Sequence, residues 1–137
     1  MSTLRTNALE GVDAKNSITI VAGAGNITTT NVQEGLMKGW LNLNGTGTIA
    51  ILDSFNVSGI TDDGTGQYIH THSNPMNNAL YSVALMSKRA TSTNNSGITN
   101  QDGTFTTAAV RMLLSKFDNL SSHDAEMVFT QIAGDLA

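Results

Sequence analysis

From Gly45 onward, apolar and polar residues alternate in short stretches, and this alternation constrains the fold more than any other feature of the sequence. Side chains on a strand point alternately to its two faces, so such stretches predict strands that bury one face. The strand-like stretches are TGTIAIL, SFNVSGI, GQYIHTH, ALYSVALMSK, TFTTAAVRMLLSKF and AEMVFTQIA. Segments rich in Gly, Asn, Asp and Ser separate them, as is typical of turns. The pattern predicts a mainly β chain with an antiparallel β-sandwich-like module.

Two places in this pattern carry more specific predictions. The stretch AAVRMLLSKF is also compatible with a helix, but its lead-in TFTT is rich in Thr and favours a strand. Between SFNVSGI and GQYIHTH, Asp63 and Gly64 form a dipeptide that is common in hairpin turns, because Gly readily adopts positive φ. The two flanking strands are therefore expected to pair as a hairpin.

The beginning of the chain has a different character. SITIVAG, residues 17–23, is rich in β-branched residues and predicts a strand. A helical pattern follows it and gives way to period-two alternation near residue 44. The sequence therefore predicts two regions, an attachment or oligomerisation segment at 1–43, with a short strand and helix, and an antiparallel β module at 44–137.

The helical pattern after the first strand has one narrow apolar stripe. Its members recur at helical spacing and are Val32, Leu36 and Trp40. Gly35 and Gly39 weaken such a helix, each by about 1 kcal/mol relative to Ala. A helix this short and this weak needs partners, so the stripe is the predicted interface of a homo-oligomer.

Composition and charge exclude several classes of function. Charged residues are only 13% of the chain and the net charge is −4, and Lys88 and Arg89 are the largest basic cluster, which argues against nucleic acid as a partner. Without Cys, disulfides, zinc–thiolate sites and thiol catalysis are excluded. No apolar run is long enough to insert in a membrane. No paired carboxylates or activated nucleophile are evident, so the chain is not expected to be an enzyme or to hold a cofactor.

The segment KGWLNLNGTGTIAILDSFNVSGITDDGTGQY, residues 38–68, has a dense and specific pattern. It resembles a recurrent segment of tail-fibre and related appendage proteins of bacteriophages, especially marine and cyanobacterial phages. Near the C-terminus, AEMVFTQIAGD is similar to the strand that closes the same module. One departure is Leu52, where the related segment often has Arg; an apolar residue there is consistent with an edge that is buried against a neighbour.

The resemblance implies a bacteriophage virion structural protein. The implied protein is a non-enzymatic, fibre-like appendage subunit that mediates virion attachment or contact with the host surface. The expected partners are sister chains in a homotrimer, other virion proteins and a host-surface glycan or protein. A head or neck decoration protein that binds capsid subunits is an alternative, and a stand-alone carbohydrate-binding module is another.

Two further sites follow from the strands and loops of the β module. His70 and His72 alternate along one strand and so share a face. The simpler interpretation is a polar pair on an exposed face; at the axis of a trimer, six such imidazoles could instead bind a metal. The longest predicted loop, 89–103, is made of small polar residues that suit outward contacts, or it is only a solvated linker. Its candidate contact residues are Thr93, Asn94, Asn95, Ser96 and Asn100.

Overall fold

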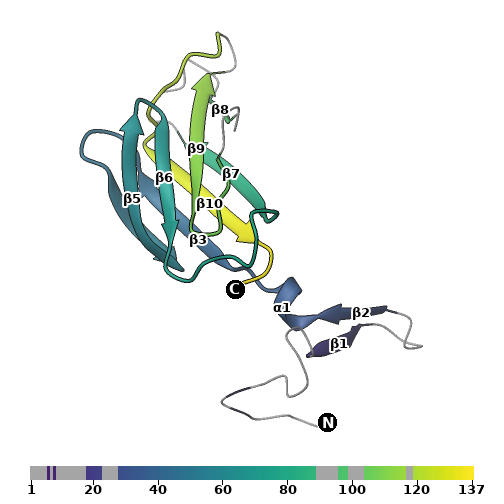
Figure 1. The fold of residues 1–137 in the computed structure, drawn as a ribbon. Coiled ribbons are helices and arrows are strands. Elements are labelled where there is room, and N and C mark those ends of the chain that lie inside the picture. The colour runs from purple at the N-terminus through teal and green to yellow at the C-terminus, as the bar shows by residue number, and fades with distance from the viewer. Residues whose placement is uncertain are drawn as a thin grey trace. The chain divides into compact units, whose positions relative to one another are not determined.

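The computed structural model describes residues 6, 8, 18–22, 28–88, 96–98, 104–116 and 119–137. The chain divides into two compact units, Met1–Leu36 and Met37–Ala137. The first unit contains an antiparallel pair of strands, β1 (Thr19–Ala22) and β2 (Thr28–Asn31), and then the helix α1 (Val32–Gly35) (Figure 1). The backbone N–H of Val32 donates to the Ile18 carbonyl at 2.9 Å, which closes the strand pair at the start of the helix.

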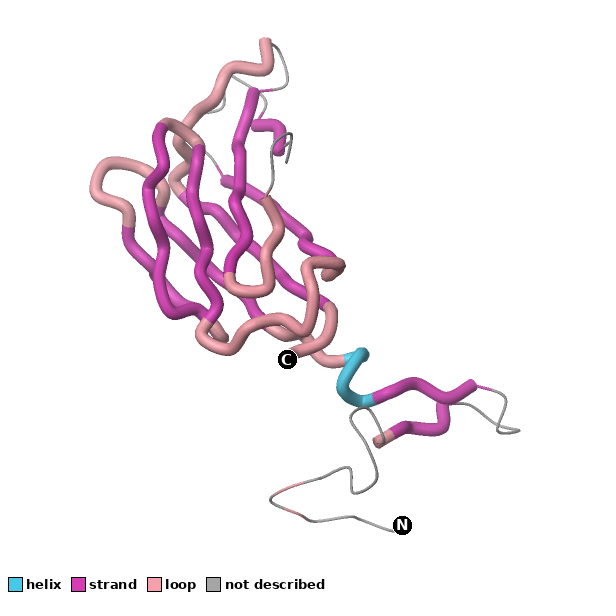
Figure 2. Tube along the Cα trace, viewed as in Figure 1, coloured by secondary structure: helices cyan, strands magenta, loops and turns pink. Residues whose placement is uncertain are grey.

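The second unit is built from antiparallel strands in two sheets (Figures 1 and 2). Its strands are β3 (Gly39–Asn44), β4 (Ala50–Phe55), β5 (Val57–Gly64), β6 (Gln67–His72), β7 (Ser82–Lys88), β8 (Ser96–Ile98), β9 (Ala109–Lys116) and β10 (Met127–Ala133). Within the described residues, one sheet has the order β4-β3-β10-β7 and the other the order β5-β6-β9-β8. The prediction of a mainly β, antiparallel fold is confirmed.

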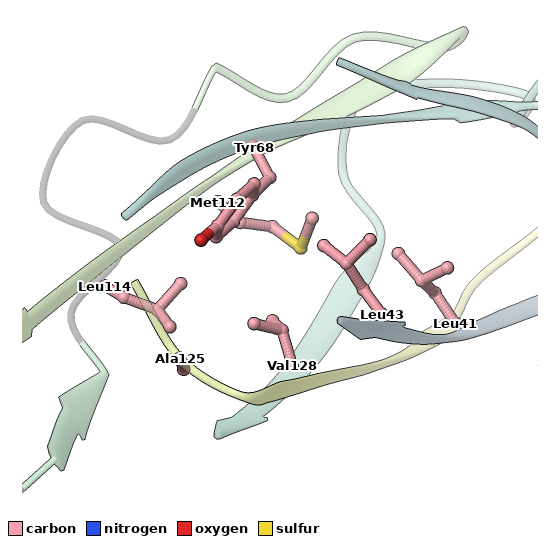
Figure 3. Close-up of a cluster of buried hydrophobic side chains, with 7 residues drawn as sticks. All are labelled: Leu41, Leu43, Tyr68, Met112, Leu114, Ala125 and Val128. Atoms are coloured by element: carbon pink, nitrogen blue, oxygen red, sulfur yellow. The ribbon is translucent and has the colours of Figure 1, made fainter. Parts of the chain in front are cut away.

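The two sheets bury their facing sides against each other. Leu41 and Leu43 of β3 and Val128 of β10 come from one sheet, and they form one cluster with Tyr68 of β6 and Met112 of β9 from the other (Figure 3). All five are nearly inaccessible to solvent. Burying a side chain of this size contributes about 1.5–3 kcal/mol to folding, so this cluster holds the sheets together.

The predicted pairing of β5 with β6 as a hairpin is confirmed, but its turn is formed by Thr65 and Gly66, whereas Asp63 and Gly64 end β5. Glycines make this turn possible. Gly64 has a φ of 128° and Gly66 a φ of 67°, which L side chains rarely adopt. A Cβ at Gly66 would also lie 2.6 Å from the carbonyl oxygen of His123. Just after the turn, the buried Tyr68 hydroxyl donates to the Gly45 carbonyl at 2.6 Å, and burial raises the pKa of Tyr68 so that it stays neutral.

The helix predicted from the stripe Val32, Leu36 and Trp40 is not formed beyond a single turn. It ends at Gly35, and Trp40 lies in β3, which pairs with β10 and β4. The stretch Gly39–Asn44 alternates with period two, and its buried side chains fit the core only as a strand. For the same reason β3 belongs to the β unit, so the division of the chain falls before residue 37 and not at residue 43.

The segment 89–103 also differs from the predicted loop. Ser96–Ile98 forms β8, which pairs with β9 between Leu114 and Lys116. Small polar residues do not favour a strand by themselves, but an unpaired length of β9 offers backbone partners to any neighbouring segment. In the described part of the chain, no helix is long and apolar enough to cross a membrane.

Candidate interaction surface

The outward side of the sheet β4-β3-β10-β7 carries a concentration of large apolar side chains. Cross-strand pairing places its residues in two adjacent rows, Phe55–Trp40–Gln131–Ala84 and Asp53–Asn42–Phe129–Met86. We call this surface the aromatic face. Residues directly opposite each other on one face of antiparallel strands have Cβ atoms about 4.5–5.5 Å apart, so each row is a continuous surface.

The core dictates which side chains reach this face. Leu41 and Leu43 point into the sandwich, so Trp40, directly before Leu41, and its cross-strand partner Phe55 point outward. Val128 and Thr130 are likewise buried, which turns Phe129 of β10 outward. The large apolar residues of the aromatic face are therefore additional to the core and contribute nothing to the packing between the sheets.

Several of these side chains remain in contact with solvent. Met86 is 67% exposed and Phe55 is 52% exposed, while Trp40 and Phe129 are half-buried by their neighbours on the sheet. A single exposed apolar residue is ordinary on a protein surface, but a contiguous group typically marks an interaction site. Trp and Phe in particular are enriched in the centres of protein interfaces.

The outward side of the opposite sheet is polar, and we call it the polar face. Arg111 of β9 lies 2.6 Å from the carboxylate of Asp63 and donates a second bond to the side-chain oxygen of Gln67. Thr61 and Thr71 occupy neighbouring positions on β5 and β6. Among the described residues of this face, Arg111 and Asp63 are paired within the chain, and the apolar positions Ile69 and Leu113 are partly buried.

Charged side chains lie at both edges of the aromatic face. Asp53 lies on β4 at one edge, and Lys88 lies on β7 at the other, where it pairs loosely with Glu126 at 3.8 Å. Both Lys88 and Glu126 are well exposed, so this pair contributes little to folding. Asp53 therefore lies at one border of the apolar surface, and Lys88 with its partner Glu126 lies at the other.

A register shift in the pairing of β4 with β3 affects Leu52. Asn42 is opposite Asp53 and Leu43 is opposite Ile51, so Leu52 is the extra residue of a β-bulge and has no cross-strand partner. It is 52% exposed on a strand that ends the sheet. The expectation that this edge is buried against a neighbour stays a prediction.

Among the predicted interface residues, only Trp40 belongs to the aromatic face. Val32 lies in α1 and Leu36 directly after it, both in the first unit of the chain, and Leu36 is 59% exposed. The three residues do not share the helical stripe on which the prediction rested. The interface prediction for Val32 and Leu36 thus loses its geometric argument, and for Trp40 it moves to a different surface.

The predicted contact residues of the segment 89–103 are only partly described. Thr93, Asn94, Asn95 and Asn100 lie outside the described residues. Ser96 is the first residue of β8, opposite Lys116 of β9. The role of this segment in outward contact stays a prediction.

The interpretation of His70 and His72 as an exposed polar pair is wrong. They do share a face of β6, but that face is turned into the sandwich, and the residues are 0% and 6% exposed. Because both rings lie between the two sheets of their own chain, they cannot meet copies at the axis of a trimer. Within the described residues, no group of three or more His, Asp or Glu side chains is placed to hold a metal ion.

Comparisons with known proteins do not add to this geometry. No family model matches the chain. No curated protein and no solved structure matches it either.

Proposed function

We propose that the chain is a non-enzymatic structural subunit of a bacteriophage virion, of the fibre-like appendage type, and that it assembles through the aromatic face. The observation that carries the proposal is the position of Trp40, Phe55, Phe129 and Met86 on one outward surface of a small sandwich. A surface of this kind serves assembly better than catalysis, because its large side chains are apolar and its two rows contain neither a pair of carboxylates nor a nucleophile beside a base.

The resemblance of residues 38–68 to phage appendage proteins supports the same proposal. In this chain the segment runs from just before β3 to the start of β6. It therefore supplies the edge strand β4 and two members of the aromatic face, Trp40 and Phe55. An appendage module needs a rigid scaffold and a contact surface, and this one segment contributes to both.

The partner that best fits the aromatic face is a second copy of the chain. A two-fold axis parallel to the strands would place β4 of one copy over β7 of the other. Asp53 of each copy would then lie over the row that ends at Met86 of its partner, one row from Lys88, while the apolar rows meet between them. Such complementary charges at the rim of an interface favour one orientation of the two surfaces. This contact joins two copies, whereas the resemblance implies a trimer, and a mass measurement distinguishes them.

The virion assignment is tested by labelling particles. An antibody to the purified chain is applied to phage particles from the source culture and viewed by negative-stain electron microscopy. Label on the tail or its fibres is the expected result. Label over the head or neck would replace the appendage proposal with that of a decoration protein bound to capsid subunits. Particles that carry no label, while the same antibody detects the chain in the lysate, would contradict both.

A carbohydrate-binding module is a second candidate, because Trp40 and Phe55 are adjacent in one row and could form a platform for a sugar ring. Under this alternative, the purified chain binds defined glycans on an array and Trp40→Ala removes the binding without changing the oligomeric state. The appendage proposal through self-association expects the opposite result, a change of oligomeric state in the same variant.

A further inference from the structure

The sandwich contains a pair of buried histidines that the proposed function does not use. His70 and His72 lie on the inward side of β6, with ring centroids 5.0 Å apart and the rings in edge contact at 71°. The ring of Tyr81 continues the series, 5.7 Å from His72. Two adjacent imidazoles inside a core are unusual, since His is rarely fully buried.

The hydrogen bonds of the pair are incomplete. Nδ1 of His70 lies 3.3 Å from Oγ1 of Thr130 on β10, and this contact links the two sheets. Nε2 of His70 and both ring nitrogens of His72 are buried and have no hydrogen-bond partner among the described residues. Buried polar atoms are normally paired, so these three atoms weaken the core and call for an explanation.

The groups that face the pair do not favour a positive charge. Ile60 and Val57 of β5 and Val110 of β9 are the cross-strand partners on either side, and all three are apolar. Across the core the pair faces Thr130, and beside it the hydroxyl of Tyr81, which donates to the backbone and stays neutral because burial raises its pKa. Burial, together with the neighbouring His72, lowers the pKa of His70 to about 4, and burial lowers the pKa of His72.

We propose that His70, His72 and Thr130 form an acid-sensitive latch between the two sheets. When both imidazoles are neutral, they pack against Thr130, Tyr81 and Val110 and hold β6 to β10. Protonation places a positive charge, and then two adjacent ones, where no carboxylate among the described residues lies opposite. The charged rings can be solvated only if the sheets separate at this end of the sandwich.

The direction of the pH dependence follows from the two states of His70. In the unfolded chain the imidazole takes up a proton near its ordinary pKa of 6.5, but in the folded chain only near 4. Between these values the unfolded chain binds more protons, so stability falls as the pH falls. The part of the free energy of unfolding that depends on neutral His70 is fully present above pH 6.5, and its loss is complete near pH 4. For one histidine the unfolding constant rises about tenfold for each pH unit in this window.

The test is urea denaturation of the full chain at intervals from pH 7.5 to pH 4. The wild type is compared with the double variant His70→Leu/His72→Leu, which keeps apolar bulk at both positions, and with Leu114→Ala as a core control. Leu114 is fully buried in the other core cluster, so the control weakens the core without altering the surroundings of the two histidines. We expect the unfolding constants of the wild type and the control to rise equally as the pH falls. In the double variant, the rise for each pH unit should be smaller by a factor of at least about ten.

Equal pH dependence in the wild type and the double variant would overturn the proposal. If the double variant does not fold at pH 7.5, the variant His70→Gln takes its place with the same expectation for one histidine. NMR titration of the imidazole signals in the folded wild type is an independent readout. Signals of His70 that titrate near pH 6.5 in the folded chain would also overturn the proposal.

Discussion

The two outer faces of the sandwich follow the same strand alternation but carry different chemistry. On the aromatic face, Trp40, Phe55 and Met86 leave apolar area in contact with solvent. On the polar face, Arg111 is paired with Asp63 and Gln67 within the chain. The charged pair of the polar face is satisfied within the chain, while the aromatic face would gain free energy if it were covered. This difference is the reason that we propose assembly through the aromatic face.

The largest loss of assembly is expected when charges are placed on the aromatic face. In Phe55→Asp/Met86→Asp, both altered side chains are largely exposed, so the fold is expected to persist. Assembly is expected to weaken by at least about a hundredfold, because the new carboxylates would be buried without partners. Sedimentation velocity measures the dissociation constant, and a thermal melt checks the fold.

The control for this variant adds two carboxylates at exposed positions of the β5–β6 hairpin, outside the aromatic face. Thr61 and Thr65 are both exposed, and Thr61 lies on the polar face. Thr61→Asp/Thr65→Asp should assemble like the wild type. Equal weakening in both double variants would mean that net charge, and not the aromatic face, controls assembly.

A smaller effect is expected from Trp40→Ala, which removes apolar area without adding charge. Trp40 lies between Phe55 and Gln131 in the central part of the face. Truncation of an aromatic residue at the centre of an interface typically costs about 2 kcal/mol of binding free energy, or roughly thirtyfold in the dissociation constant. Trp40→Phe should restore most of the loss. If Trp40→Ala lowers the melting temperature but leaves association unchanged, Trp40 stabilises only its own sheet.

The smallest effect is expected on the polar face. Arg111→Met removes the ion pair with Asp63 but keeps most of the side-chain bulk. Because both charged groups are partly exposed, the change in the free energy of unfolding should be within about 1 kcal/mol. Association should be unchanged, since this face is not part of the proposed contact. A clear loss of assembly in Arg111→Met would show that the polar face is also an interface.

The strands after Gly45 could be predicted because alternation and turn residues agree there. Strand β3 could not be predicted, because its residues fit two patterns. Trp40 lies four residues after Leu36, as in a helix, but residues 40–43 also alternate as in a strand. Only the pairing of β3 with β10, far away in the sequence, decides between them. β8 was missed because its composition is that of a loop and its strand geometry comes from pairing with β9.

The candidate surface could not be predicted from the sequence, for a related reason. The sequence predicts Trp40 as an interface residue, but its neighbours on the face, Phe129 and Met86, lie far from it in the chain and are brought there by register. The shared face of His70 and His72 followed from alternation. Their burial did not, because the period of a strand shows which residues share a side without showing which side is the core.

We infer that the aromatic face is covered by another copy of the chain, and this inference is tested most directly by the mass of the purified 137-residue chain in solution. Sedimentation equilibrium over a range of concentrations gives this mass and its dependence on dilution. We expect the wild type to sediment as a multiple of the chain mass, two copies for the face-to-face contact, and Phe55→Asp/Met86→Asp to sediment as a folded monomer. A wild type that is a folded monomer at every concentration would contradict the claim, as would an oligomer that the double variant leaves intact.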